Sequence, residues 1–373
     1  MAETSGKKQC ISNNSNENET KSSKKETDKT VNVYCKLNYD VLILIFENLN
    51  AKDLSNAVMV CRLWQSAARR VKNRRDFPIV MEYEPDKHCK FMLENLAIKP
   101  RLGIYLLPKT CFKDKKFCNL VLPRNCDLIL IESYGIIFND KAEESYENIV
   151  CSLLPEPADI KIKSFTFRKN FFANSILNIE ELITFFDNSN TNERLERCLI
   201  LLCDSNTKQR TLQILRKIKR RYPGDNISYW GGVVRRLLLL SIGDSDKCIL
   251  KEFPLCIGIA LMGPSIRTWS IILDEMCTTE KEIRCKLMAL KTVVSLQRHS
   301  IAFLMSCHSR ENEKEIAIFV ELFPNIPLIG TYADGEFGRE KLLKEKYVSY
   351  FDKQDILFYS SVFMILSYGV SNM

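Results

Sequence analysis

Apolar residues begin to recur at helical spacing only after a long polar stretch at the N-terminus. In LNYDVLILIFENL, Val41, Leu42, Ile45 and Leu49 stand one to four positions apart, which is typical of an amphipathic helix. Residues 1–32 are mostly Asn, Ser, Lys, Glu and Thr, so burial cannot offset the entropy lost on ordering them. We therefore expect a disordered tail over 1–32 and a folded chain after it.

A second short helix follows the first. Asn38 and Asn50 are both of a residue type that caps helix N-termini. After Asn50, apolar residues stand at i, i+3, i+4 and i+7, namely Leu54, Ala57, Val58 and Cys61. The pattern predicts two or three short helices within residues 33–76. A unit this small rarely buries enough to be stable alone, so its apolar faces need cover from the rest of the chain or from another protein.

From Phe77 onward, short apolar runs of β type alternate with amphipathic helices. The runs are DLILIESYGIIF (127–138), KSFTF (163–167), RCLILLC (197–203), CIGIALM (256–262), WSIIL (269–273) and SIAFLMSC (300–307). Helices are expected at TLQILRKIKRRY and at TEKEIRCKLMALKTVVSL, where Thr279 and Glu282 fit a capping box. This alternation predicts an α+β fold, in which a small N-terminal helical unit is followed by mixed α/β lobes.

One pattern occurs twice along the chain. Residues 199–232 and 301–330 each contain a strand that ends in Cys, a helix, an aromatic residue followed by Pro, a second strand and Gly. Proline stops each helix, and Gly at the end of the strand would allow a tight or left-handed turn. The repetition predicts two related lobes, over 77–245 and 246–373.

Composition narrows the classes of protein and of partner. Of the 373 residues, 46% are hydrophobic and 27% charged, as in an ordinary globular protein. The net charge of +8 is spread along the length, and its densest run, Arg216 to Arg221 (RKIKRR), fits the outer face of a helix. No interleaved aromatic residues or nucleic-acid motif accompany that run, so we expect no nucleic acid partner. The first residues, MAETSGKKQC, contain no apolar core of a signal peptide, and the longest apolar run, near Ser361 to Leu366, is too short for a membrane span, so we expect no membrane partner.

The sequence contains few residues or motifs of the kinds that act in catalysis or in metal binding. Fifteen cysteines include no CxxC pair, which favours reduced thiols in a cytoplasmic or nuclear protein over disulfides or zinc. The sequence has three histidines, and neither GxxxxGK[ST] nor GxGxxG occurs in it. We therefore expect no metal, no cofactor and no enzyme activity of the chain's own.

The run LxxDxLxxIFxxL, then DL, then VCRLW resembles the F-box, the helical motif by which substrate receptors dock on Skp1 in cullin–RING ubiquitin ligases. The match also includes Asp40, Asp53 and Arg62, and it departs from the family at Asn38, where Pro is usual. The resemblance implies Skp1 as a partner and, through Skp1, a cullin–RING module. The side chains it implies for Skp1 binding are Leu37, Leu42, Ile45, Phe46, Leu49, Leu54, Val60, Cys61 and Trp64.

Beyond residue 76 the sequence resembles FIST domains. The resemblance is strongest in IGIALMGPSIRTWSIILDE, IAFLMSCHSR and FPNIPLIGTYADGEFG, and it extends to DLILIESYGIIF and LLPEPADIKIKSFTF. It implies that the two lobes are FIST lobes, one N-type and one C-type, and that DILFYSSVFMILSYG forms a closing C-terminal helix. FIST domains are thought of as sensors of small ligands, and the resemblance implies that role as well.

Two strand ends from the related lobes could converge on a cleft for a ligand or substrate. The residues there are Cys307, His308, Arg310, Gly335, Glu336 and Gly338. The glycines would let backbone approach a ligand, and Arg310 would meet an acidic group. In the alternative reading, Cys307 is a small buried hydrophobe, Gly335 a turn residue and Arg310 solvated. Cys307 and His308 are not expected to form a catalytic pair, because neighbours in a strand point to opposite faces.

The sequence thus predicts a non-catalytic substrate receptor. The F-box would hold the protein on Skp1, and the FIST lobes would hold a protein substrate for ubiquitylation and degradation by the proteasome. The alternative is a small-ligand sensor, in which the F-box helices are a packing element or couple ligand occupancy to substrate capture.

Overall fold

The structure is a computed structural model that describes residues 37–84, 95–113, 126–167, 179–187, 195–223, 227–242, 248–251, 256–341 and 355–369. The chain divides into two units, Met1–Asn38 and Tyr39–Met373. The predicted disordered tail over 1–32 lies outside the described residues. All of the sheets and helices named below belong to the second unit.

Three short helices open the second unit, as the apolar pattern predicted. They are α1 (Tyr39–Phe46), α2 (Ala51–Ala57) and α3 (Arg62–Asn73). Asn50 caps α2, because its side chain accepts a hydrogen bond from the backbone N–H of Asp53 at 2.8 Å. The helices enclose a small core of their own, made of Leu42, Ile43, Phe46, Leu54, Ala57, Ala67, Ala68 and Val71.

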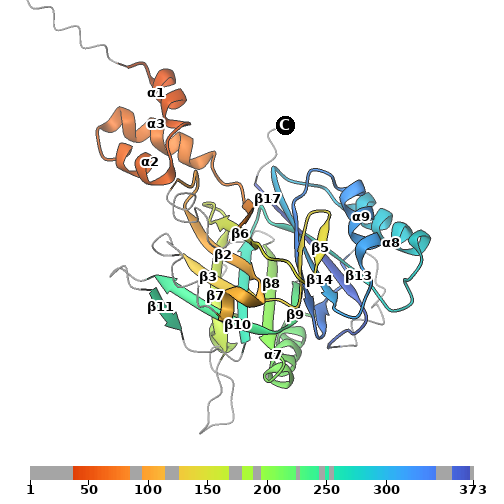
Figure 1. The fold of residues 1–373 in the computed structure, drawn as a ribbon. Helices are drawn as coiled ribbons and strands as arrows, with labels where there is room; N and C mark the ends of the chain where they lie inside the picture. Colours follow the sequence, from red (N-terminus) through yellow and green to blue (C-terminus); the bar gives the residue numbers. More distant parts are fainter. Residues whose placement is uncertain are drawn as a thin grey trace, which may run out of the picture. The chain divides into compact units, whose positions relative to one another are not determined.

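The strands in the rest of the described chain form three sheets (Figure 1). The first has the order β1 (Ile79–Tyr83), β6 (Ile149–Pro155), β2 (Pro100–Leu107), β3 (Asp127–Glu132), β10 (Arg236–Ile242) and β11 (Cys248–Lys251). The second is β16 (Glu336–Gly338), β9 (Ser228–Val234), β8 (Glu196–Asp204), β12 (Cys256–Gly263) and β7 (Lys161–Phe167). The third is β13 (Arg267–Leu273), β17 (Ser361–Tyr368), β14 (His299–Cys307), β15 (Leu328–Ala333), β4 (Ile136–Phe138) and β5 (Lys141–Glu143).

Helices cover the outer faces of two of these sheets. α6 (Ile179–Asp187) and α7 (Lys208–Arg221) pack on the second sheet, while α8 (Glu280–Val293) and α9 (Glu313–Leu322) pack side by side on the third (Figure 1). A further short helix, α5 (Lys109–Lys113), follows β2. One apolar cluster contains residues of all three sheets, so the sheets share a core. The predicted α+β class is confirmed.

The two predicted lobes share their sheets. Strand β12 lies between β8 and β7, and β4 and β5 extend the sheet that otherwise holds β13, β14, β15 and β17. The predicted boundary at residues 245 and 246 therefore does not coincide with a boundary between sheets.

The repeated pattern is present as two equivalent units, β8–α7–β9 and β14–α9–β15, each with parallel strands. Its glycines, however, are inside the strands and not at their ends. Gly231 lies directly opposite Leu201, and Gly330 directly opposite Leu304. A Cβ atom at either glycine would meet the backbone carbonyl of that leucine, so both glycines serve close strand approach and not a turn.

The predicted closing helix at the C-terminus is wrong. Residues Ser361–Tyr368 form β17, which pairs antiparallel with β13 on one side and with β14 on the other. Every residue of SVFMILSY is buried, whereas a helix on the surface needs a polar face. A short run that is apolar on both sides is instead typical of a central strand covered on both faces.

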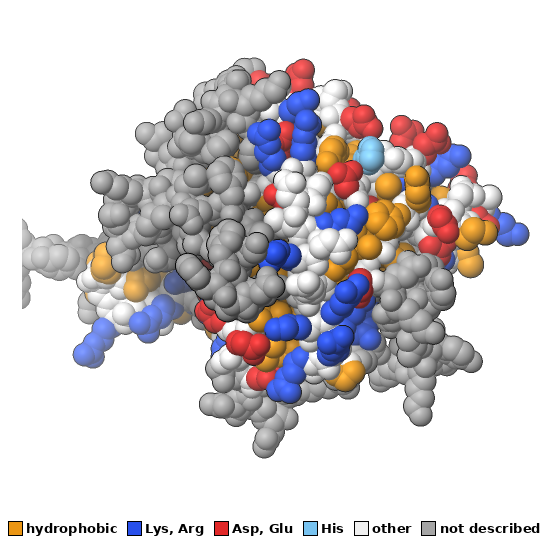
Figure 2. Space-filling view, turned by 90° about the horizontal axis from the view of Figure 1, so that it is seen from below, with side chains coloured by type: hydrophobic (Ala, Val, Ile, Leu, Met, Phe, Trp, Pro, Cys, Tyr) orange, Lys and Arg blue, Asp and Glu red, His pale blue; other side chains and the backbone are white. Residues whose placement is uncertain are grey.

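The basic run of α7 is a solvated helix face that pairs with nearby carboxylates. Arg216 lies 2.5 Å and Lys219 3.5 Å from Asp355, and Arg221 lies 2.6 Å from Asp187. In Figure 2, basic side chains form separate groups with acidic side chains between them on the face shown. These pairings support the interpretation of the run as a helix surface.

Candidate docking surface and cleft

The inner face of the three helices is a closed core. Leu42, Phe46 and Leu54 are almost completely buried, and the rings of Phe46 and Trp64 meet edge to face with centroids 5.1 Å apart. Trp64 and Leu49 are half-buried against the same cluster. We predicted these five side chains as contacts of a partner. The structure assigns Leu42, Phe46 and Leu54 to holding the helices together, because their surface is already covered.

The same helical unit also carries exposed apolar side chains, on α1 and around the connection of α2 to α3. Val41, Leu44 and Ile45 lie on one face of α1, and Met59, Val60 and Leu63 follow in the connection to α3 and at its start. The exposed fractions reach 78% for Met59 and 62% for Leu44. We call these six residues the apolar surface. Groups of exposed apolar residues on a folded unit mark sites of interaction with other proteins.

The predicted contacts divide between these two faces. Ile45 and Val60 belong to the apolar surface, and Leu37 and Cys61 are also exposed. The sequence prediction missed Leu44, Met59 and Leu63. A signal for Leu44 exists in α1, YDVLILIF, which is apolar on nearly every side. Such a helix needs cover on both faces, and its own core supplies only one.

Arg75 joins the helices to the segment that precedes β2. Its guanidinium donates to the carbonyl oxygens of Phe46, Glu47 and Leu49 at the end of α1, at 2.8, 2.9 and 2.6 Å, and to that of Ala97 at 3.1 Å. The backbone N–H of Ala51 also donates to Leu96 O at 2.8 Å. The carbonyl groups at a helix C-terminus lack partners within the helix, and a cation there is doubly favourable.

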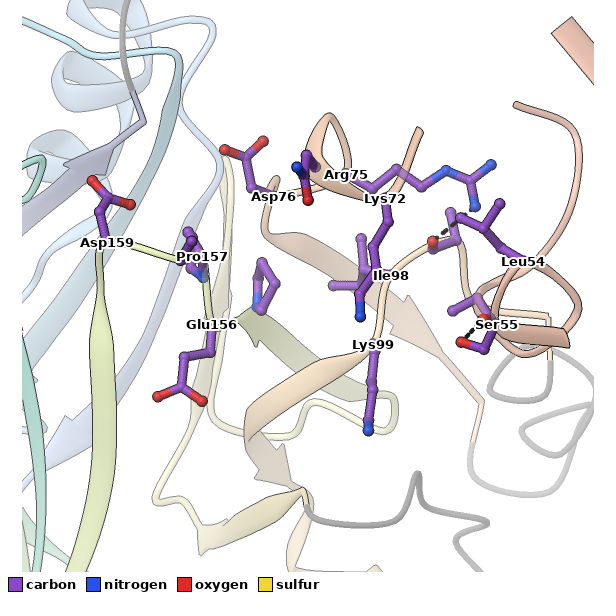
Figure 3. Close-up of a pocket in the computed structure, with 15 residues that line it drawn as sticks. Leu54, Ser55, Lys72, Arg75, Asp76, Ile98, Lys99, Glu156, Pro157 and Asp159 are labelled. Carbon is purple, nitrogen blue, oxygen red and sulfur yellow. Dashed lines mark hydrogen bonds between the residues drawn. The ribbon is translucent and has the colours of Figure 1, made fainter. Parts of the chain in front are cut away.

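A pocket of about 300 Å³ lies beside this junction (Figure 3). Leu54 and Lys72 line it from the helices, Ile98 and Lys99 from the segment before β2, and Glu156 from the turn after β6. In Figure 3, Arg75 and Lys72 lie on the helical side of the pocket and Glu156 on the other. The residues that line the pocket carry charges of both signs.

Strands of the two repeats lie close together, since the backbone N–H of Asp334, just after β15, donates to Val233 O in β9 at 2.9 Å. Cys307 ends β14, and the backbone N–H of His308 donates to Ala333 O at the end of β15. From the other repeat, β9 pairs with β16, where Glu336 stands opposite Gly232. His308 is exposed, and its ring stacks on Tyr134 with centroids 5.7 Å apart. Cys307 is buried, as the alternative reading expected.

The guanidinium of Arg310 is fully used in hydrogen bonds to groups of the same chain. Its Nε donates to Glu315 Oε1 at 2.6 Å, and its terminal nitrogens donate to the carbonyl oxygens of Asp274, Tyr359 and Cys277 at 2.9, 2.8 and 2.5 Å. The side chain is 9% exposed and Glu315 is buried. Neither reading of the sequence holds for Arg310, since it is not solvated and has no fork free for an acidic ligand.

The predicted cleft around Gly335, Glu336 and Gly338 is filled by the chain itself. Gly335 has a φ of +147°, a conformation that favours glycine, and a Cβ there would meet Ile356. A Cβ at Gly338 would meet Val362. The prediction that these glycines admit a ligand is wrong for this structure, because side chains of the same chain occupy the space.

Glu336 is a buried carboxyl group without a cation beside it. Ser360 Oγ donates to its Oε2 at 2.8 Å, while Oε1 has no partner among the described residues. Burial raises the pKa of Glu336 to about 8, against smaller lowering effects that include the charge of Arg310. The folded chain therefore keeps this proton to a higher pH than the unfolded chain.

Replacing Glu336 with glutamine is expected to change how stability depends on pH. Between about 4.5, the ordinary pKa, and about 8, the folded wild type holds a proton that the unfolded chain has lost, so its stability falls as pH rises. Glu336→Gln removes that loss. From pH 5 to pH 8 the unfolding free energy of the variant should rise relative to that of the wild type by about 3 kcal/mol.

Urea denaturation at both pH values measures this gain. Glu180→Gln, at an exposed position on α6, is the matched control and should follow the wild type. A constant difference between Glu336→Gln and the wild type at the two pH values would contradict the assignment.

The described residues lack two kinds of feature. No group of three or more His, Cys, Asp or Glu side chains is placed to hold a metal ion in the described ranges. No helix in that part of the chain is long and apolar enough to cross a membrane.

The chain resembles known proteins both in one domain and over most of its length. Residues 35–76 match the F-box domain. Over 356 residues the chain is 22% identical to F-box only protein 22 of Pongo abelii and 23% identical to F-box only protein 22 of Homo sapiens, with 83% of this chain and 86% of each relative covered. Among solved structures, cyanuric acid hydrolase from A. caulinodans matches with a TM-score of 0.33 and 8% identity, covering 79% of this chain and 100% of that chain. The structural likeness is too slight to carry an argument.

Proposed function

The chain carries an F-box domain at residues 35–76, and from this premise we propose that it is a substrate receptor of an SCF-type ubiquitin ligase. In this proposal the helices α1 to α3 dock on Skp1, which connects them to a cullin–RING module. The sheets beyond residue 76 bind a protein substrate. The likeness to F-box only protein 22 over most of the chain supports the proposal for the whole chain and not only for the domain.

The mechanism is proximity. The receptor holds substrate lysines near a conjugating enzyme that is charged with ubiquitin, and it supplies no reacting group of its own. Holding two reactants on one scaffold raises the effective concentration of one at the other, to the millimolar range for flexible tethers. The transfer chemistry belongs to the conjugating enzyme.

The observation that carries the proposal is the apolar surface. The core of the helices is closed by Leu42, Phe46 and Leu54, so the exposed Val60 and Leu63 are not needed to fold them. Apolar anchors on a helical element that fill pockets of a partner supply much of the energy of such complexes. The apolar surface is therefore the face that we assign to Skp1.

Glutamate placed on this surface is expected to abolish capture of Skp1. Val60→Glu together with Leu63→Glu would place two carboxylates in an apolar interface without partners, which costs several kcal/mol of binding free energy, on the order of a hundredfold or more in affinity. Co-expression of the full chain with Skp1, followed by pulldown, measures the loss.

A matched control is available on the sheet-containing part. Leu296 is 42% exposed, close to the 44% of Leu63, and it lies between α8 and β14. Leu296→Glu should capture Skp1 as the wild type does. Capture by the double variant at the wild-type level, with an unchanged melting curve, would show that another face binds Skp1. Failure of the folded wild type to capture Skp1 would refute the proposed function.

A further inference from the structure

A cavity of about 940 Å³ opens at the carboxyl ends of the parallel strands β14 and β15. Residues from the connection of β13 to α8, from the connection of β14 to α9 and at Tyr359 line it. The volume lies within the range of pockets that hold small molecules or short pieces of peptide. The cavity adjoins His308 and Arg310, but it is distinct from the filled space around Gly335 and Glu336.

Four exposed carboxylates surround this cavity, those of Glu144, Glu275, Glu311 and Glu313. Throughout the described ranges, none of the four has a salt-bridge partner. The rim also holds Lys314 and Arg310. The guanidinium of Arg310 already bonds to Glu315 and to three carbonyl oxygens. The chain as a whole has a net charge of +8, so a strongly negative cavity is a local feature.

Two residues in the wall indicate which kind of ligand this negative cavity binds. Asn312 is 1% exposed; its Oδ1 accepts from the hydroxyl of Tyr332 at 3.1 Å, and its Nδ2 has no acceptor among the described residues. A buried amide donor without an acceptor is costly, and a carbonyl oxygen bound in the cavity would supply one. Tyr359 is exposed at the rim with a φ of +51°, and Arg310 holds its carbonyl oxygen. The face of an aromatic ring attracts cations.

We propose that this cavity binds a lysine or arginine side chain of the protein substrate, a proposal that rests on the receptor function argued above. The cation lies among the carboxylates and beside Tyr359, and the peptide carbonyl oxygen of the same segment meets Asn312. Lys314 and the positive N-terminus of α9 oppose a bound cation, and Glu313 in the first turn of that helix partly offsets them.

Binding of simple probes to the purified full chain tests the proposal. The probes are N-acetyl-lysine methylamide and N-acetyl-arginine methylamide, with N-acetyl-norleucine methylamide as the uncharged match, and saturation-transfer NMR measures their binding. We expect the two cationic probes to bind and the norleucine probe to bind at least about tenfold more weakly. Raising the salt concentration should weaken the cationic probes, since exposed charges are screened.

Variants of the rim locate the binding. Glu275→Gln combined with Glu311→Gln should weaken the lysine probe about fivefold, because each exposed charge pair contributes up to about 1 kcal/mol. Glu180→Gln, on α6 and away from the cavity lining, should leave binding unchanged. Equal binding of the norleucine probe, or unchanged binding by the rim variant, would overturn the proposal.

Two further measurements distinguish a peptide ligand from a free amine, and the role of the cavity from the receptor function. Butylammonium has the cation without the peptide carbonyl groups and should bind more weakly than the lysine probe; equal binding would overturn the peptide assignment in favour of a free amine. Capture of Skp1 by the same preparations is measured in parallel and should not change in the rim variant. Loss of Skp1 capture in the wild type would refute the receptor function, whereas loss of probe binding alone would refute only the cavity's role.

Discussion

Replacing Arg75 with methionine is expected to destabilise the three helices and their attachment by about 3 kcal/mol. Four carbonyl oxygens would lose a charged donor at once, three at the end of α1 and one, of Ala97, on the segment before β2. Methionine fills a similar volume, so the loss reports the hydrogen bonds and not a cavity. Burial lowers the pKa of Arg75, against the raising effect of Glu47, but the guanidinium remains charged.

Hydrogen exchange of the amides in α1 to α3 measures this effect where a single melting temperature would average over the whole chain. Arg74→Met is the matched control. Arg74 is exposed and pairs with Glu47 at 3.0 Å, so its replacement should cost less than about 1 kcal/mol. Arg75→Lys keeps the charge without the planar fork and should lie between the two. Equal protection in Arg74→Met and Arg75→Met would show that the junction does not depend on the Arg75 side chain.

The same junction bears on the proposed function. A receptor that works by proximity must hold its substrate at a defined distance from the charged conjugating enzyme, and reach depends on how stiffly the two binding parts are joined. Beside Arg75, the imidazole of His299 lies 2.7 Å from the carboxylate of Asp76, which follows the helices. These contacts connect the F-box domain to the sheets by side chains as well as by the chain itself.

Local features of the fold were predictable from the sequence. The capping box of Thr279 and Glu282 and the cap at Asn50 depend on residues three positions apart, and both are present. The two strand–helix–strand units were also predictable, because proline ends each helix at a fixed place in the pattern. Such signals are complete within a few residues, so no knowledge of distant neighbours is needed.

Features that depend on distant neighbours were not predictable. The closing helix expected in residues 355–369 is instead the strand β17, because β13 and β14 pair with it on its two sides. A short run that is apolar on every side does not by itself distinguish a central strand from a buried helix. Arg310 is likewise fixed by carbonyl oxygens of Asp274, Cys277 and Tyr359, which are 33 to 49 positions away along the chain. A charged residue near a strand end predicts a ligand contact only when no such internal partners exist.

The division of α1 into two faces has the sharpest experimental consequence. Leu42 and Ile45 are one turn apart, and the sequence predicted both as contacts of Skp1. Leu42 is buried in the core of the helices and Ile45 is 44% exposed. Leu42→Glu places a carboxylate in that core and should unfold the helices, at a cost of about 4 kcal/mol or more. Ile45→Glu should leave them folded, because its side chain already faces water.

Both variants are expected to lose Skp1, but for different physical reasons. Hydrogen exchange of α1 to α3 separates them: the helices of Leu42→Glu should exchange as an unfolded segment, and those of Ile45→Glu as the wild type. Leu42→Ala, which removes volume without adding charge, should lower protection by about 3 kcal/mol and retain capture in proportion to the folded fraction. If Ile45→Glu captured Skp1 normally, α1 would take no part in the interface, and the docking face would have to lie on Met59, Val60 and Leu63, which are exposed on the same three helices.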